Sequence, residues 1–310
     1  MRLSRALIFA MSLSACGFEG APVSQTGVGD STGSGNSMAD GGGVSSKSSA
    51  SILSFAVFGD SRPPNQNDTA GYPSTVISSI FSNAQASGAQ FVVGTGDYMY
   101  ATTQSAVDAQ VALFMQAQAS FTAGPVYHTM GNHECTGYTD SNCPLGTETP
   151  NVKAFMSKFV PAGVTTPYYR IDKDTTLGKV KFLFVAANAW STAQDSWLKT
   201  QLADLTPYTF VVRHEPSDDP TAPGVTPSDA LLNAAPFTLE LLGHSHEYRK
   251  LDSQHVISGN GGAPLSGHGS FGFLMIDLRA DGTVSVSEID ASTGMPKDNY
   301  RITAVGRAAP

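Results

Sequence analysis

Apolar runs alternate with helical patterns along the chain from residue 51 onward. The apolar runs are short and bounded by turn residues, as strands are: SILSFAVF, FVVG, PVYHTM, KVKFLFVAA, YTFVVR and FTLELLG. Between them, residues 74–88, 106–121 and 193–205 have apolar residues three and four positions apart, which predicts helices. In the last of these segments, the predicted apolar face carries Trp197, Leu198, Leu202 and Leu205.

The last third of the chain has a different pattern. HVISGNGGAPL and FGFLMIDLRADGTVSVSEI predict antiparallel strands, with a turn at Asp281-Gly282. Strand–helix alternation followed by strand-rich sequence predicts an α/β fold with mixed sheets. The sequence of residues 51–310 contains no second linker, so we expect these residues to form one domain.

Polar residues follow five of the apolar runs where each predicted strand ends. These residues are Gly59-Asp60, Gly96-Asp97-Tyr98-Met99-Tyr100, Gly131-Asn132-His133-Glu134, His214 and Gly243-His244-Ser245-His246. Sites in open α/β sheets lie at the carboxyl ends of strands, so we expect the five segments to converge. Each segment alone is weak evidence, since a single Gly-Asp is usually a turn. Together they supply carboxylate, imidazole, amide and phenol groups, which suit one hard and one borderline metal ion.

The same series, GD, GDxxY, GNHE, a strand-borne His and GHxH, resembles the calcineurin-like metallophosphoesterase superfamily. The GDYMY segment is similar to the purple acid phosphatase branch in particular, and the likeness extends over residues 53–275. The resemblance implies a β-sandwich of two mixed sheets flanked by helices, in four αββα layers. It also implies a site with two metal ions at one edge of the sandwich.

The resemblance implies a role for each site residue. Asp60, Tyr100 and His246 would hold the first metal, which is Fe(III) in purple acid phosphatases. Asn132, His214 and His244 would hold the second metal, which is Zn, Fe or Mn. Asp97 would bridge the two ions. His133 would face the substrate, as a phosphate contact or as the general acid for the leaving alkoxide.

Arg62 departs from the pattern, because the wider superfamily has His at this position. A guanidinium stays protonated, so Arg62 is not expected to bind metal, and by resemblance Tyr100 takes the coordination place of the missing His. Two interpretations of Arg62 stay open: a surface or salt-bridged residue, and a bidentate anchor for a phosphate oxygen. We expect Glu134 to accept hydrogen bonds near the site and Arg213, His128 and His255 to be structural, whereas His268 is a candidate pocket residue.

The predicted function is metal-dependent hydrolysis of phosphate esters, with phosphomonoesters as the substrates. Two alternatives stay open: a phosphodiesterase or nucleotidase on the same fold, and a non-catalytic, lipid-anchored surface-binding protein. A formal net charge of −8 argues against nucleic-acid binding, because phosphate backbones need a basic surface.

The first 50 residues carry export signals instead of a fold pattern. Arg2 and Arg5 precede the short apolar segment ALIFAMSLSA, and residues 13–16 (LSAC) resemble a bacterial lipobox, with Cys16 as the lipidated residue. We therefore expect a signal peptide over residues 1–16 and a Gly/Ser-rich tether over residues 17–50. The protein would be an exported lipoprotein of the cell envelope, held to the membrane through Cys16, at the outer membrane or cell surface instead of the inner membrane. A cleaved signal with an incidental Cys, or a buried first helix, is the alternative.

Cys135 and Cys143 remain after Cys16 is assigned to lipidation. An oxidising compartment and the short polar segment between the two residues favour a disulfide. Two free thiols or two soft-metal ligands are the alternatives.

Overall fold

A computed structural model describes residues 50–136, 142–143, 148–306 and 309. Cys16, the expected signal peptide and residues 17–49 of the expected tether lie outside the described residues. All described helices and strands belong to one compact unit, Ser48–Pro310. In the described part of the chain, no helix combines the length and the apolar character needed to cross a bilayer.

The unit contains two six-stranded mixed sheets. The first sheet has the order β12-β11-β10-β1-β2-β3, in which β1, β2 and β3 are parallel and β10 to β12 form an antiparallel meander. Its strands are β1 (Ser51–Phe58), β2 (Val92–Gly94), β3 (Val126–His128), β10 (Gly272–Arg279), β11 (Val284–Asp290) and β12 (Pro296–Ile302).

The second sheet has the order β4-β5-β6-β7-β9-β8. Four central strands are parallel, and β4 and β8 close the two edges in the antiparallel direction. Its strands are β4 (Tyr169–Thr175), β5 (Gly178–Phe184), β6 (Tyr208–Val212), β7 (Leu239–Leu242), β8 (Tyr248–Lys250) and β9 (His255–Ser258).

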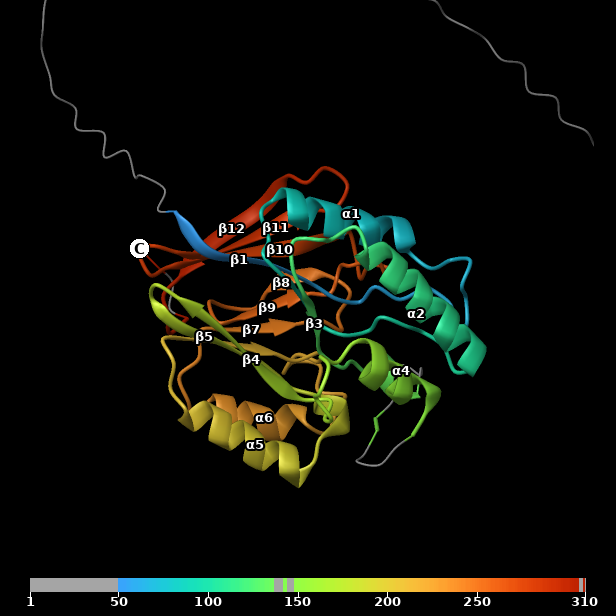
Figure 1. The fold of residues 1–310 in the computed structure, drawn as a ribbon, viewed down its shortest axis with the longest axis horizontal. Coiled ribbons are helices and arrows are strands. Elements are labelled where there is room, and N and C mark those ends of the chain that lie inside the picture. The colour runs from blue at the N-terminus through green and yellow to red at the C-terminus, as the bar shows by residue number, and fades with distance from the viewer. Residues whose placement is uncertain (1–49, 137–141, 144–147, 307–308, 310) are drawn as a thin grey trace, which may run out of the picture. The chain divides into compact units, whose positions relative to one another are not determined.

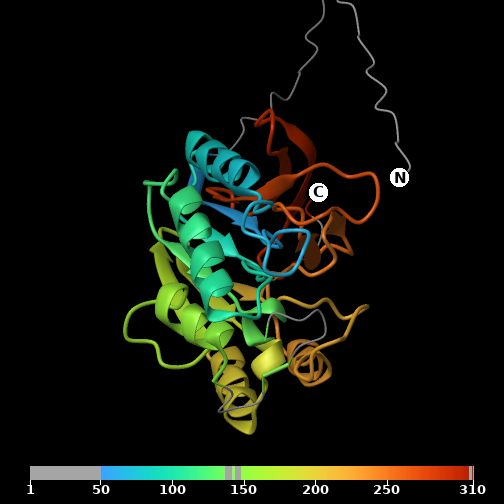
Figure 2. The ribbon, with the colours of Figure 1, turned by 90° about the vertical axis from the view of Figure 1, so that its right-hand side faces the viewer.

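Helices cover the outer face of each sheet, so the unit has four layers (Figures 1 and 2). α1 (Ser74–Ala86), α2 (Gln104–Gln118) and α4 (Pro150–Lys158) pack on the first sheet, and α5 (Thr192–Ala203) and α6 (Val225–Leu232) pack on the second. A short helix, α3 (His133–Thr136), and a 3₁₀ turn, Ala187–Ala189, lie in the connections. The β-sandwich with flanking helices confirms the expected fold class.

The strand β1 shows why the layers form. Its residues alternate between faces, as the pleat of a strand requires. Phe55 and Val57 belong to the apolar core between the sheets, whereas Ala56 and Phe58 belong to the core beneath α1 and α2. Both faces are therefore apolar, which explains the unbroken hydrophobic run in the sequence.

The prediction that Leu205 belongs to the core is wrong. Leu205 is 71% exposed, because α5 ends at Ala203 and Leu205 lies in the turn that follows. Leu198 and Leu202 are buried as expected, and Trp197 packs partly buried against the same cluster.

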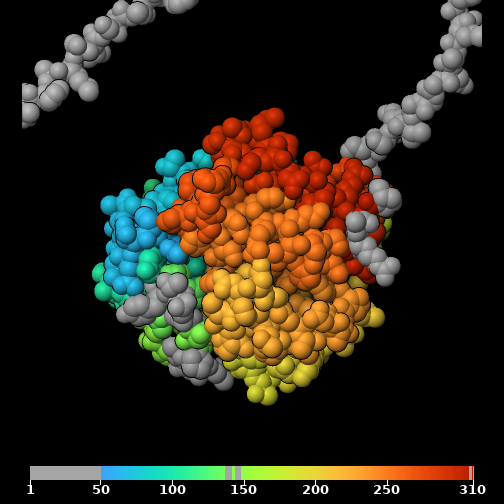
Figure 3. Space-filling view, turned by 180° about the vertical axis from the view of Figure 1, so that it is seen from behind, coloured from blue at the N-terminus to red at the C-terminus, as the bar shows by residue number. Residues whose placement is uncertain are grey.

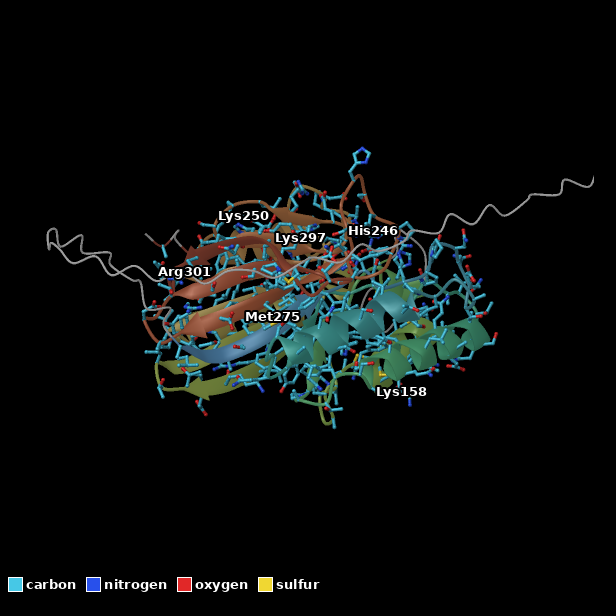
Figure 4. All side chains as sticks on the ribbon, turned by 90° about the horizontal axis from the view of Figure 1, so that it is seen from above. Lys158, His246, Lys250, Met275, Lys297 and Arg301 are labelled. Atoms are coloured by element: carbon cyan, nitrogen blue, oxygen red, sulfur yellow. A yellow bond between two sulfur atoms is a disulfide. The ribbon has the colours of Figure 1, made fainter. Side chains whose placement is uncertain are left out.

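The connections that carry the candidate site residues leave the carboxyl ends of parallel strands in both sheets. Viewed from above, His246 lies near the end of the unit opposite to Arg301 on β12 (Figure 4). Viewed from behind, orange and red segments from the last third of the chain form much of the surface (Figure 3).

Candidate metal centre

Four of the predicted ligand residues have a left-handed backbone. The φ angles are 55° at Asp60, 60° at Asp97, 71° at His244 and 43° at His246. Among the other described residues, Asn67 alone shares this conformation without being glycine. A left-handed non-glycine residue costs about 1–3 kcal/mol, and such residues cluster at functional sites. The backbone strain alone therefore indicates that these four positions belong to a functional site, independently of their side-chain chemistry.

Two glycines let these turns approach each other closely. A Cβ atom on Gly131 would collide with the carboxylate of Asp97, and one on Gly96 would collide with the imidazole of His214. The glycines that precede Asp97 and Asn132 thus allow segments from different strands to converge.

Asp60, Asp97 and His246 form the first ligand group. Their ligand atoms lie within 4.8 Å of one another, and Asp60 Oδ1 is 3.6 Å from His246 Nε2. Asp60 Oδ2 accepts a hydrogen bond from the His244 backbone at 2.9 Å, but buried Oδ1 accepts none from any described residue. Burial raises the pKa of Asp60 well above its ordinary value, although His214 opposes the shift. A cation bound at Oδ1 would offset this cost of burial, so Asp60 fits the role of a metal ligand.

His214 is the centre of a second ligand group. Its Nδ1–H donates to the carbonyl of Thr95 at 2.7 Å, so its Nε2 points the other way. There Nε2 faces two oxygens, Asn132 Oδ1 at 3.1 Å and Asp97 Oδ1 at 3.3 Å. A lone pair that faces two acceptor oxygens needs a proton or a metal ion between them.

His244 completes the second group, since its Nδ1 is 3.2 Å from Asn132 Oδ1. Metal–ligand bonds of about 2.0–2.1 Å in a tetrahedral site place neighbouring ligand atoms roughly 3.3–3.4 Å apart. The observed separations of 3.1–3.3 Å are close to this spacing. The donor set of the second group therefore fits a metal ion.

Asp97 lies between the two groups. Oδ1 faces His214, while Oδ2 is 3.6 Å from His133 Nε2 and 3.8 Å from Arg62 Nε. Burial alone would raise the pKa of Asp97, but the charges of His214 and His133 outweigh it and lower that pKa well below its ordinary value. Asp97 thus approaches His214 of the second group, and one of its oxygens lies within 4.8 Å of the ligand atoms of Asp60 and His246, which is the position a bridging ligand needs.

Glu134 fixes the turns around Asp97. Its carboxylate accepts backbone hydrogen bonds from Asp97, Tyr98 and Gly131 at 2.8–2.9 Å. Burial, together with the charge of Asp97, raises the pKa of Glu134 to about 7. The expected role of Glu134 as a hydrogen-bond acceptor matches these contacts.

Tyr100, His133 and Arg62 form one wall of the site. The Tyr100 and His133 rings meet edge to face, with centroids 4.6 Å apart. The guanidinium carbon of Arg62 lies 4.8 Å from the centroid of the Tyr100 ring. The side chain of Arg62 is only 11% exposed, so the interpretation of Arg62 as a surface residue is wrong, whereas its pairing with a carboxylate is observed.

Glu215 was not predicted as a site residue, yet it lies at the second group. Its carboxylate is fully buried, and one ligand atom lies within 4.8 Å of ligand atoms of His214 and His244. Oε1 accepts from the Asn188 amide, while Oε2 accepts a hydrogen bond from no described residue. Burial raises the pKa of Glu215, although His214 opposes the shift. In the sequence, the signal that could have predicted Glu215 as a site residue is its position next to His214 in the segment RHEP.

Other polar residues singled out in the sequence have structural partners. Arg213 is buried and pairs with Asp229 at 2.7 Å and Glu240 at 3.1 Å. His255 contacts Asp252 and Glu240. His128 is buried among aromatic rings, and His268 is exposed.

The Sγ atoms of Cys135 and Cys143 are 2.18 Å apart and form a disulfide. The bond joins α3, which carries His133, to a segment whose Cys143 N–H donates to the Asn188 carbonyl at 3.0 Å. The same asparagine holds Glu215 through its side chain. The disulfide therefore pins a loop beside the second ligand group.

Comparisons with known proteins agree with the fold. The family model described as calcineurin-like phosphoesterase matches residues 54–248. The chain belongs to this family. A search of curated protein sequences found no significant match.

Among solved structures, a purple acid phosphatase (PPD1) isolated from yellow lupin (Lupinus luteus) seeds is similar, with a TM-score of 0.62 and 17% identity. The alignment covers 82% of this chain and 54% of the lupin chain, so the phosphoesterase chain described here spans about half of that protein. A cold-active protein-tyrosine phosphatase of a psychrophilic Shewanella species matches over 79% of this chain at 13% identity, with a TM-score of 0.39.

Proposed function

We propose that this phosphoesterase-family chain hydrolyses phosphate esters with a centre of two metal ions, and that phosphomonoesters are its substrates. The observation that carries the proposal is the position of Asp97. Its Oδ1 lies 3.3 Å from His214 Nε2 of the second ligand group, and a carboxylate oxygen of Asp97 lies within 4.8 Å of the ligand atoms of Asp60 and His246 in the first.

The donor chemistry distinguishes the two metal positions. Asp60, Tyr100 and His246 would hold the first ion, and a phenolate among them favours Fe(III). Asn132, His214 and His244 would hold a divalent Zn, Fe or Mn ion, with buried Glu215 beside them. When bound, the two ions supply Lewis-acid polarisation of the phosphoryl group and a water of lowered pKa.

His133 is placed to serve the leaving group. Its backbone N–H donates to Asp97 Oδ1 at 3.1 Å, and its ring packs against Tyr100. These contacts fix the imidazole beside the bridging carboxylate. In this position His133 would contact the phosphate and donate a proton to the leaving alkoxide oxygen.

A second candidate function, hydrolysis of phosphodiesters, is favoured by Asp219. Its Oδ2 is 3.4 Å from His244 Nε2, and the side chain is 54% exposed at the site. This negative charge repels a monoester dianion more strongly than a diester monoanion. The neighbouring Asp218 is paired with Arg249 at 2.8 Å and adds less to this effect.

Turnover of para-nitrophenyl phosphate and of its bis ester, measured across pH after reconstitution with Fe, Zn or Mn, tests both candidates. We expect the monoester to be the better substrate and Asp97→Asn to abolish turnover of both. Asp172→Asn, at a surface ion pair on β4, is the matched control. Faster diester turnover would select the second candidate, and no turnover in any metal-loaded form would reject catalysis.

Iron bound through Tyr100 has its own signature. We expect a purple, iron-containing protein whose colour is lost in Tyr100→Phe. A colourless enzyme that is fully active with zinc or manganese alone would reject the ferric assignment.

We also propose that the chain is exported and held to the cell envelope by lipid on Cys16. The basic start, the short apolar segment and the LSAC sequence support this proposal. In the native host, Cys16→Ser should move the protein from the detergent phase to the aqueous phase on Triton X-114 partitioning.

A further inference from the structure

Arg62 contacts the same groups that would bind the first metal. Its Nη2 is 3.2 Å from His246 Nε2, its Nε is 3.8 Å from Asp97 Oδ2, and its guanidinium lies over the Tyr100 ring. Its positive charge also lowers the pKa of Asp60, against the larger effect of burial. One cationic side chain thus contacts His246, Asp97 and Tyr100, and its charge also acts on Asp60.

The contact with His246 has a definite direction. His246 Nδ1–H donates to the carbonyl of Pro264 at 2.9 Å, so Nε2 carries the single in-plane lone pair of the ring. An Arg side chain has donors and no acceptor, so Arg62 Nη2 donates to that lone pair. A metal ion at His246 would need the same lone pair. The hydrogen bond from Arg62 and a bond from His246 to metal are therefore mutually exclusive.

Arg62 makes few short polar contacts for a largely buried cation. Its Nε donates no hydrogen bond to a described residue, and the ion pair with Asp97 is long at 3.8 Å. A further bond, from Nη1 to the carbonyl of Pro63 at 3.3 Å, stays within its own loop. Side chains at the rim reach solvent, with exposed fractions of 12% for His244 and 16% for His246. Few contacts would be lost if Arg62 moved toward the open rim.

We propose that Arg62 is an internal cation that competes with the first metal ion, and that metal binding displaces it toward the phosphate of the substrate. This inference rests on the proposed function, because it needs a metal at Asp60, Tyr100 and His246. Without that metal, the guanidinium places one positive charge beside the carboxylates of the first ligand group. After displacement, the guanidinium matches two phosphate oxygens in a bidentate contact.

Calorimetric titration of the metal-free, full-length protein with Zn²⁺ tests the competition. We expect two binding events in the wild type, with the first site the weaker one. Arg62→Ala should tighten binding at the first site by about tenfold, the factor that one charge-assisted hydrogen bond contributes. Arg170→Ala is the matched control, since Arg170 also pairs with carboxylates but lies on β4. It should leave both metal affinities unchanged.

Inhibition by inorganic phosphate tests the displaced position. In the enzyme loaded with two metals, Arg62→Ala should weaken phosphate inhibition by about tenfold, and Arg62→Lys should restore part of it. Arg62→Gln, which keeps the volume and removes the charge, replaces Arg62→Ala if that variant does not fold.

The outcomes separate this inference from the proposed function. Two metals bound with identical affinities in wild type and Arg62→Ala would overturn the competition while leaving the metal centre in place. Unchanged phosphate inhibition would overturn the anchoring role. Absence of any metal binding by the wild type would overturn both the inference and the proposed function.

Discussion

His133 is a buried imidazole that contacts both the Asp97 carboxylate and the Tyr100 ring without belonging to either candidate ligand group. We expect His133→Ala to lower kcat by about 10²–10⁴-fold, as loss of a general acid does, while the metal content stays at the wild-type level. Steady-state kinetics and metal analysis of the same preparation check both parts. His255→Ala is the control, because His255 contacts only Asp252 and Glu240 among charged described residues. Unchanged turnover would reject the role of His133.

Glu215 is the residue for which charge and shape can be separated most cleanly. Glu215→Gln keeps an acceptor oxygen for Asn188 but removes the negative charge beside His214 and His244. We expect affinity at the second metal site to fall by about 10–100-fold, the usual effect of losing a group that supports metal ligands. Competition with a coloured chelator measures this metal affinity. Glu247→Gln, at a partly exposed ion pair, is the control. Equal affinities in Glu215→Gln and wild type would make Glu215 a purely structural residue.

At the scale of elements, the sequence pattern finds the inner strands and the edge strand β3 but misses the edge strands β4, β8 and β12. β1, β5, β6 and β7 are buried strands, and their apolar runs predict them directly. β4 (YRIDKDT) and β12 (PKDNYRI) lie at sheet edges with mostly polar or exposed residues, so they show no apolar run. An edge strand is fixed by pairing with its neighbour, which a local pattern does not contain.

Residues of the candidate site also differ in whether a local sequence pattern predicts them. Candidate ligands at strand ends, such as Asp60 and His214, are predicted because each follows its own apolar run. Glu215 and Arg62 are different, since their positions depend on contacts with Asn188 and His246 from distant segments. Only tertiary packing brings those partners together.

The strand β3 carries a pH-sensitive core residue. Burial among Tyr98, Phe114 and Phe159 lowers the pKa of His128 to about 3. In the unfolded chain the pKa is about 6.5, so the unfolded state binds the extra proton between these values. The stability that neutral His128 contributes is therefore present above pH ~6.5 and is lost as pH falls toward 3.

We expect this residue to lower the free energy of unfolding by about 2 kcal/mol between pH 7 and pH 5. Urea denaturation of wild type and His128→Phe at both pH values measures the difference. The variant should lose about that much less stability on acidification. Parallel pH profiles for wild type and His128→Phe would contradict the prediction.

At the scale of the whole unit, the ligand groups join the two sheets. Asp60, Asp97 and Asn132 follow strands of the first sheet, and His214, His244 and His246 follow strands of the second. A metal that binds only the folded state stabilises it by about 4 kcal/mol at a thousandfold excess over Kd. For a unit of this size, that corresponds to an increase in Tm of about 10 °C.

Scanning calorimetry with and without a chelator measures this increase. Removal of metal should lower the Tm of the wild type by about the same amount. Asp97→Asn should unfold at nearly the same temperature in both conditions. A wild-type Tm that does not respond to metal would contradict a metal centre that links the sheets.

The left-handed backbone at Asp60, Asp97, His244 and His246 has an evolutionary consequence. Glycine adopts this conformation without steric cost, so selection for stability alone would replace these residues with glycine. The three large apolar cores contain none of the four, and the scaffold would survive such replacements. Homologues that have lost catalysis should therefore accumulate glycine at these four positions while their cores stay apolar. Persistence of Asp and His there across a lineage would be a sign that the strain is being maintained by selection for activity.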